Sequence, residues 1–126
     1  EELLKPTRIY VETVLNLLRD FRISGISHIT GGGLTDNLPR ILPKSCRAVL
    51  HRQSWPVPPI FHFLKEQGNI PEDEMRRTFN NGIGLALVDQ GLVADIMLRL
   101  QALGEHAFVI GEITARKNDE PPMVYV

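Results

Sequence analysis

The sequence predicts an α+β fold in which a mixed β-sheet of four or five strands is packed with helices, as an α/β sandwich. Two observations support this class. Short apolar segments of strand length alternate along the chain with segments in which apolar residues recur at helical spacing. Glycine or proline separates most of these segments. Because helices connect successive strands, we expect some strand pairs to be parallel or to join strands that are next but one along the chain.

In the first half of the chain we expect two helices and two strands. They are a helix at Tyr10–Asp20, a strand at Ile23–Thr30, a short helix from Thr35 to about Leu42, and a strand at Arg47–Arg52. Three glycines at 31–33 break the chain after the first strand. The polar run 35–37 offers N-caps for the short helix, and Pro43 ends it.

In the second half we expect three helices and two or three strands. They are a helix at Ile60–Gln67, a short helix begun by Pro71, a strand at Gly84–Asp89, a helix at Leu92–Leu103, a strand at Ala107–Ala115 and a last strand at Met123–Val126. Gly68 and Gly104 are expected to cap the two longer helices. Pro71 should be the first residue of its helix, followed by acidic residues that face the positive end of the helix dipole. The run 80–82, Asn-Asn-Gly, indicates a turn.

Size and charge narrow the class of protein. A chain of 126 residues is typical of one domain, and we expect residues 1–126 to form one. A formal net charge of −1 argues against a dedicated nucleic-acid binder. No apolar stretch approaches the roughly 18 residues of a membrane span, and the N-terminus lacks the order of a signal peptide. The single cysteine, Cys46, excludes an internal disulfide and favours a reducing, cytoplasmic setting.

The strongest local motif runs from His28 to Asn37, HITGGGLTDN, and reads as a strand, a glycine loop and a helix start. Gly31, Gly32 and Gly33 allow positive φ and bring several N–H groups together. The helix start adds free N–H groups and a positive potential, which together suit phosphate. The spacing fits neither a dinucleotide-binding fingerprint nor a P-loop. The alternative is a tight turn that binds nothing.

His28 is the candidate catalytic residue. It lies at the carboxyl end of the predicted strand, where ligands usually meet such a sheet. A reference pKa of about 6.5 suits proton transfer or a hydrogen bond to a developing charge. A structural histidine bonded to a backbone carbonyl is the alternative. The other three histidines lack metal-site spacing, and we expect no metal ligands in this chain.

Further residues are candidates for binding phosphate or substrate beside the three glycines: Thr7, Arg8, Thr30, Asn37 and Asn80. Arg8 has a guanidinium that grips phosphate with two parallel hydrogen bonds, but a surface arginine is the alternative. Thr30 offers a hydroxyl next to the glycines. Asn80 offers an amide to a small substrate, although Asn-Gly sequences more often form a plain turn.

Several segments, in this order, resemble one family. They are LKPTRIYV at 4–11, HITGGGLTDNLPRILP at 28–43, Trp55–Phe61, Glu74-Met75, Thr78–Gly84 and Gly104–Gly111. Together they resemble the C-terminal domain of the aminoimidazole ribonucleotide synthetases, which are phosphoribosylformylglycinamidine cyclo-ligases. Distant relatives of that family usually carry Asp where this chain has His28. Asn37–Arg40 also favours the cyclo-ligases. Asp36 and Asn81 depart from the family pattern, in which Glu and an apolar residue are more frequent.

The resemblance implies one half of an enzyme of purine biosynthesis. The family closes the imidazole ring of formylglycinamidine ribonucleotide, using ATP and Mg²⁺ that are held mainly by an N-terminal domain. That domain is absent from this chain, so we expect the isolated chain to be inactive. The resemblance further implies a cytoplasmic, homodimeric full-length protein whose cleft lies between the two domains. The alternative function is a non-catalytic α+β module that senses phosphate or a nucleotide.

Overall fold

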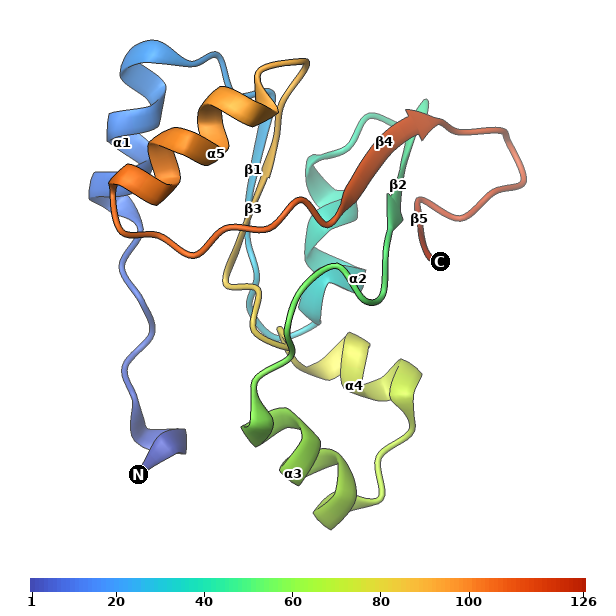
Figure 1. Cartoon of the computed structure of the whole chain (residues 1–126). Coiled ribbons are helices and arrows are strands. Elements are labelled where there is room, and N and C mark those ends of the chain that lie inside the picture. Colours follow the sequence, from blue (N-terminus) through green and yellow to red (C-terminus); the bar gives the residue numbers. More distant parts are fainter.

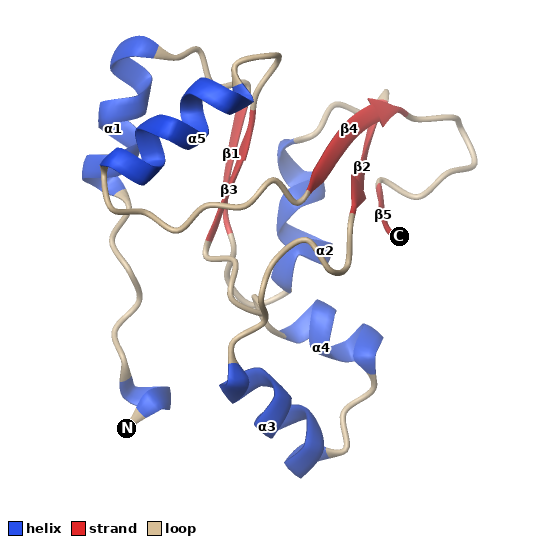
Figure 2. Cartoon of the chain, in the orientation of Figure 1, coloured by secondary structure: helices blue, strands red, loops and turns tan.

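The fold combines five α-helices with five β-strands, so the α+β class predicted from the sequence is confirmed (Figure 1, Figure 2). The computed structural model describes residues 1–126. The α-helices are α1 (Val11–Asp20), α2 (Gly33–Asn37), α3 (Pro59–Gly68), α4 (Glu72–Thr78) and α5 (Val93–Ala102). The strands are β1 (Gly25–His28), β2 (Cys46–Leu50), β3 (Leu85–Val88), β4 (Gly111–Ala115) and β5 (Met123–Tyr125). Two 3-10 helices lie at Glu2–Leu4 and Leu38–Ile41.

The strands form two sheets, where the sequence predicts one. β1 and β3 pair antiparallel, with Gly25 opposite Val88 and His28 opposite Leu85. β2 is the central strand of the second sheet, antiparallel to β4 and parallel to β5. The predicted pattern of pairs is confirmed, because one pair is parallel and the other two join strands that are next but one along the chain.

The first apolar core explains why there are two sheets. Leu34 of α2 and Leu38 of the following 3-10 helix are each 3% exposed. They share one cluster with Ala86 of β3 and Leu50 of β2. Figure 1 shows α2 between the two sheets. A helix in this position keeps the sheets apart and gives each of them an apolar surface to pack against.

The second core covers the other face of the β1–β3 sheet. Leu17 of α1 packs with Ile96 and Leu100 of α5, and Leu87 of β3 packs against this cluster. Successive residues of a strand point to opposite faces, so Leu87 faces the second core while Ala86 faces the first. α1 and α5 therefore form an outer layer, and Figure 1 shows them side by side. None of the helices is both long and apolar enough to cross a membrane.

The predicted short helix is wrong in its limits. It begins at Gly33 rather than Thr35, and it changes into a 3-10 helix at Leu38. Pro39 causes this change, because it has no N–H with which to continue the α-helical hydrogen-bond pattern.

Two predicted helix ends also need correction. α3 includes Gly68, and its left-handed cap is Asn69, with a φ of 47°. Pro71 is the N-cap of α4 and not its first helical residue. Gly104, by contrast, caps α5 as predicted. Its φ is 76°, and the amide of Glu105 donates to the carbonyl of Leu100, as in a Schellman motif.

Strands are shorter than the apolar runs that predict them. β1 covers Gly25–His28 of the predicted 23–30, and β4 covers Gly111–Ala115 of the predicted 107–115. Residues 107–110 lie in the segment that runs from α5 to the second sheet, as Figure 1 shows. Ala107 packs against the second core and Ile110 against the first, whereas Phe108 and Val109 are exposed. The predicted turn at 80–82 is confirmed. Asn81 and Gly82 have positive φ, and the amide of Ile83 donates to the carbonyl of Asn80.

Candidate functional site

The glycine loop connects β1 to α2 through two residues of positive φ. Gly32 has a φ of 102° and Gly33 a φ of 59°. A side chain on Gly33 would overlap the backbone carbonyl oxygens of Arg76 and Phe79, because α4 packs directly against the loop. Gly31 is different, since a Cβ there would meet nothing within 4 Å. Glycine is therefore needed at positions 32 and 33 for backbone geometry and close packing.

Asn37 lies beneath the loop and is 5% exposed. Its side-chain Nδ2 donates to the carbonyl oxygens of Thr30, Gly31 and Gly33, at 3.3, 3.2 and 2.9 Å. The backbone carbonyl of Asn37 accepts a hydrogen bond from the buried Ser27 hydroxyl at 3.1 Å. Asn37 therefore contacts the loop from inside the domain, and any part it has in binding a ligand passes through the loop.

Four amides around the loop are left without a partner. The amide of Gly33 donates to the carbonyl of Thr30 at 3.0 Å. The amides of Gly31, Gly32, Leu34 and Thr35 form no hydrogen bond within the domain. Thr30 and Gly31 are exposed. These unpaired amides are donors that an anion could use, and Gly31 and Gly32 are more accessible than the buried Leu34.

His28 lies at the carboxyl end of β1, and its exposed imidazole forms no hydrogen bond with the protein. The structural alternative, a bond to a backbone carbonyl, is not formed. The ring instead meets the ring of Tyr10 edge on, with centroids 6.2 Å apart. The Tyr10 hydroxyl lies against Gly84, the residue that precedes β3. The pKa of Tyr10 is raised above its usual value. Burial is the main cause, the charge of Glu105 adds to it, and the charge of Arg8 opposes it.

Arg8 points toward the end of α5 rather than to the glycine loop. Its Nη2 lies 2.8 Å from Oε2 of Glu105. Oε1 of the same carboxylate accepts a hydrogen bond from the Thr13 hydroxyl at 2.8 Å. Thr7 is exposed and forms no side-chain hydrogen bond. The structure thus brings Tyr10 to His28, and it pairs Arg8 with Glu105, which follows α5.

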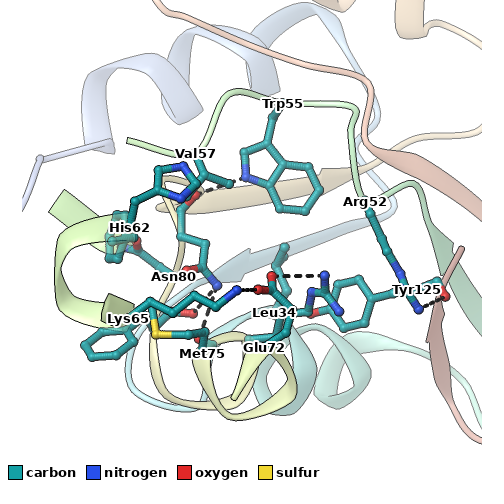
Figure 3. Close-up of a pocket in the computed structure, with 14 residues that line it drawn as sticks. Leu34, Arg52, Trp55, Val57, His62, Lys65, Glu72, Met75, Asn80 and Tyr125 are labelled. Carbon is teal, nitrogen blue, oxygen red and sulfur yellow. Dashed lines mark hydrogen bonds and ion pairs between the residues drawn. The ribbon is translucent and has the colours of Figure 1, made fainter. Parts of the chain in front are cut away.

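Asn80 lies in a separate hollow of about 100 Å³ between α3, α4 and the end of the second sheet (Figure 3). The Asn80 Oδ1 accepts a hydrogen bond from the amide of Gly82 at 2.9 Å. On another wall the Arg76 guanidinium lies 4.9 Å above the ring of Tyr125. The hydroxyls of Tyr125 and Thr35 are hydrogen bonded at 3.0 Å. This bond connects the hollow to α2, the helix that follows the glycine loop.

The hollow is lined by three cationic side chains, Arg52, Lys65 and Arg76, and by one carboxylate, Glu72. Glu72 pairs with Lys65 and with Arg76. The hydrogen bond from Lys65 is the main cause that lowers the pKa of Glu72. Burial raises the pKa of Tyr125, while the hydrogen bond to Thr35 and the charge of Arg76 lower it.

Four residues that contact the candidates or their surroundings are not predicted from the sequence: Tyr10, Arg76, Glu105 and Tyr125. Tyr10 stands in the segment 4–11 already singled out, so its proximity to that motif is a usable signal. The others are brought in by tertiary contacts, and no local pattern marks them.

Comparison with known proteins agrees with the resemblance read from the sequence. The family described as "AIR synthase related protein, C-terminal domain" matches residues 1–123. A phosphoribosylformylglycinamidine cyclo-ligase of Syntrophotalea carbinolica is 58% identical over 125 residues, which is 98% of this chain and 36% of that protein. The cyclo-ligase of Geotalea uraniireducens is 60% identical over 114 residues, 90% of this chain and 33% of that protein.

The chain therefore spans about a third of the length of these relatives. The matched residues 1–123 include His28, the glycine loop and the residues of the hollow beside α4 other than Tyr125. The predicted family is confirmed, and the chain belongs to the AIR synthase related proteins, as their C-terminal domain.

Proposed function

We propose that this chain is the C-terminal part of an ATP-dependent cyclo-ligase, which converts formylglycinamidine ribonucleotide to aminoimidazole ribonucleotide in de novo purine biosynthesis. The relatives named as this cyclo-ligase support the reaction. The main structural support for a phosphate site is the group of unpaired amides at Gly31, Gly32, Leu34 and Thr35, which follow His28 in the chain.

The proposed reaction has two steps. A phosphoryl group passes from ATP to the formyl oxygen of the substrate, and ADP is released. An amidine nitrogen then attacks the activated carbon, the bond from that carbon to the phosphorylated oxygen breaks, phosphate leaves, and a proton passes to a base. Phosphoryl transfer depends mainly on positioning and on neutralising charge. A row of backbone N–H groups supplies both to a phosphate, and it does so without a mobile side chain.

Each residue of the site has a proposed part. Gly31, Gly32 and Gly33 shape the loop that receives a phosphate. The exposed Thr30 adds a hydroxyl, which within the domain donates to Oδ1 of Asn37 at 3.5 Å. His28 acts in proton transfer or stabilises developing charge, because its imidazole is exposed and free of hydrogen bonds within the domain.

Three other candidate residues, Thr7, Arg8 and Asn80, make no hydrogen bond with the glycine loop. Arg8 and Thr7 reach a substrate only if Arg8 exchanges its partner Glu105 for a phosphate. Asn80 takes part from the wall of the neighbouring hollow. Their proposed role is to contact parts of the substrate that extend beyond the glycine loop.

No three His, Cys, Asp or Glu side chains of this chain converge on one point. We propose that Mg²⁺ and most of the ATP contacts belong to the N-terminal domain of the longer protein, with Mg²⁺ held there by carboxylates and phosphate oxygens. We further propose that the longer protein is a cytoplasmic homodimer.

An apolar stripe on α1 supports a partner domain. Val11, Leu15 and Leu18 are 60%, 55% and 47% exposed, and their spacing places them on one side of the helix. Such a stripe is usually covered by another surface. The N-terminal domain of the same polypeptide is the partner that the length of the relatives suggests.

The experiment compares two polypeptides in a ring-closure assay with ATP, Mg²⁺ and formylglycinamidine ribonucleotide. One is the longer natural polypeptide that contains this chain, and the other is the 126-residue chain alone. We expect product only from the longer protein. A longer protein that binds nucleotide or phosphate but never closes the ring would instead support the alternative, a non-catalytic sensing module.

A further inference from the structure

We propose that Asn37 is a positioning residue, whose buried carboxamide turns the peptide groups of the glycine loop so that their N–H groups face a bound phosphate. This inference rests on the proposed function of the loop. It assigns to Asn37 an effect on the direction of the donors, and no direct contact with the ligand.

The geometry of the peptide group relates the carbonyls that Asn37 binds to the amides that remain free. In a trans peptide the carbonyl oxygen of one residue and the N–H of the next point in opposite directions, and the chain has no cis peptide. Asn37 Nδ2 binds the carbonyls of Thr30, Gly31 and Gly33. The N–H groups on the other side of those three peptides belong to Gly31, Gly32 and Leu34.

These are three of the four amides that have no partner within the domain. One side chain therefore accounts for the direction of three neighbouring donors. The fourth, the amide of Thr35, is left free by its place in the first turn of α2.

Burial explains why the effect must be indirect. Asn37 is 5% exposed, and Nδ2 has two hydrogens for three carbonyl oxygens at 3.3 Å or less. No hydrogen remains for a ligand. Three carbonyl dipoles that converge on one point repel one another, and the Asn37 donor among them offsets this repulsion.

The helix gives Asn37 its place. Asn37 is four residues after Gly33, which is about one turn, and helical side chains lean toward the N-terminus. The carboxamide therefore lies directly under the loop. An aspartate at position 37 has nearly the same shape but presents only acceptors when ionised, so Asn37→Asp changes the chemistry while keeping the volume.

The test uses the ¹⁵N-labelled 126-residue chain, titrated with inorganic phosphate and followed by NMR. In the natural sequence we expect phosphate to shift the amide signals of Gly31, Gly32 and Leu34. Asn37→Asp should weaken this response about tenfold or more, because the loop peptides lose the donor that fixes their direction. A tenfold change corresponds to about 1.4 kcal/mol of binding free energy. Asn37→Leu, which also lacks the donor, should behave in the same way.

Ser27→Ala is the matched control. It removes the buried bond from the Ser27 hydroxyl to the backbone carbonyl of Asn37 but leaves the loop carbonyls bound. We expect it to lower the melting temperature while phosphate affinity stays within about twofold of the natural sequence. If Ser27→Ala weakens phosphate as much as Asn37→Asp, or if folded Asn37→Asp keeps its affinity, the inference is overturned.

A second measurement needs no variant and no ligand. The side-chain NH₂ protons of Asn37 should exchange with solvent at least about tenfold more slowly than those of the exposed Asn118, because they are hydrogen bonded and buried. Equal exchange rates would refute the role of Asn37 even if its variants fail to fold. A natural chain with protected Asn37 protons but no response to phosphate would refute the proposed function of the loop, and it would overturn the ligand-directed part of this inference.

Discussion

The ring of Tyr10 meets the imidazole of His28 edge on, with 6.2 Å between the ring centroids. Tyr10 stands just before α1, and His28 ends β1, so this contact fixes the N-terminal segment against the carboxyl end of that strand. The absence of a side chain on Gly84 leaves room for the Tyr10 hydroxyl. The candidate catalytic residue is thus oriented by a residue from a different segment of the chain.

The first prediction concerns His28 in the full-length enzyme. His28→Ala should lower turnover by about 10²-fold or more, as expected for the loss of a group that transfers a proton or stabilises charge. The control is His51→Ala, because the His51 side chain is also exposed and lies at the end of β2, in the other sheet. Steady-state kinetics over a range of pH give the result, and an unchanged rate for His28→Ala at every pH would assign that residue a structural role.

A pair of glycine variants tests the packing of the loop. Gly33→Ala should destabilise the domain by about 3 kcal/mol or more, because its φ is positive and the new methyl group would overlap the carbonyls of Arg76 and Phe79. Gly31→Ala should change stability by no more than about 0.5 kcal/mol, since its Cβ would meet nothing. Urea unfolding measures both. Equal costs at the two positions would contradict the loop geometry.

The ion pair between Arg8 and Glu105 gives a prediction for the N-terminal segment. Glu105→Gln should speed trypsin cleavage of the Arg8–Ile9 bond, because the carboxylate holds both the Arg8 guanidinium and the Thr13 hydroxyl. The global cost should be small, about 1 kcal/mol or less, since Arg8 is half exposed. Glu112→Gln on β4 is the control, and cleavage at the same rate in both variants would show that the segment is held by other contacts.

Tyr125 predicts how stability responds to alkaline pH. Burial raises its pKa above the usual 10.0, so folding favours the neutral phenol. The resulting stability is present below pH 10 and is lost as pH rises through the folded-state pKa. Urea unfolding between pH 9 and 11 should therefore show a shallower alkaline loss for Tyr125→Phe than for the natural chain. Parallel curves for the two proteins would contradict this account.

Local patterns predicted most helices and the position of every strand. The end of α5 at Gly104 and the turn at Asn81-Gly82 follow from residues adjacent in sequence, whose conformational preferences act locally. The division into two sheets did not follow, because it depends on Leu34 and Leu38 filling a space between strands far apart in the chain.

The candidate site, like the fold, was predicted from the sequence only where its features are local. Glycine in the loop and His28 at a strand end are visible in sequence. The inward-facing amide of Asn37 is not, because a side chain that binds the backbone of a preceding loop leaves no periodic trace. The contacts of Tyr10 and Glu105 also join segments that only the tertiary fold brings together.

The most direct test of the central claim is a crystal structure of the full-length enzyme with formylglycinamidine ribonucleotide bound. We expect a phosphate of the substrate, or the phosphate produced from ATP, to accept hydrogen bonds from the amides of Gly31, Gly32 and Leu34, with His28 facing the reacting group. A substrate bound elsewhere, for example with its phosphate on Arg52 and Arg76 in the neighbouring hollow and no anion on the loop amides, would contradict it.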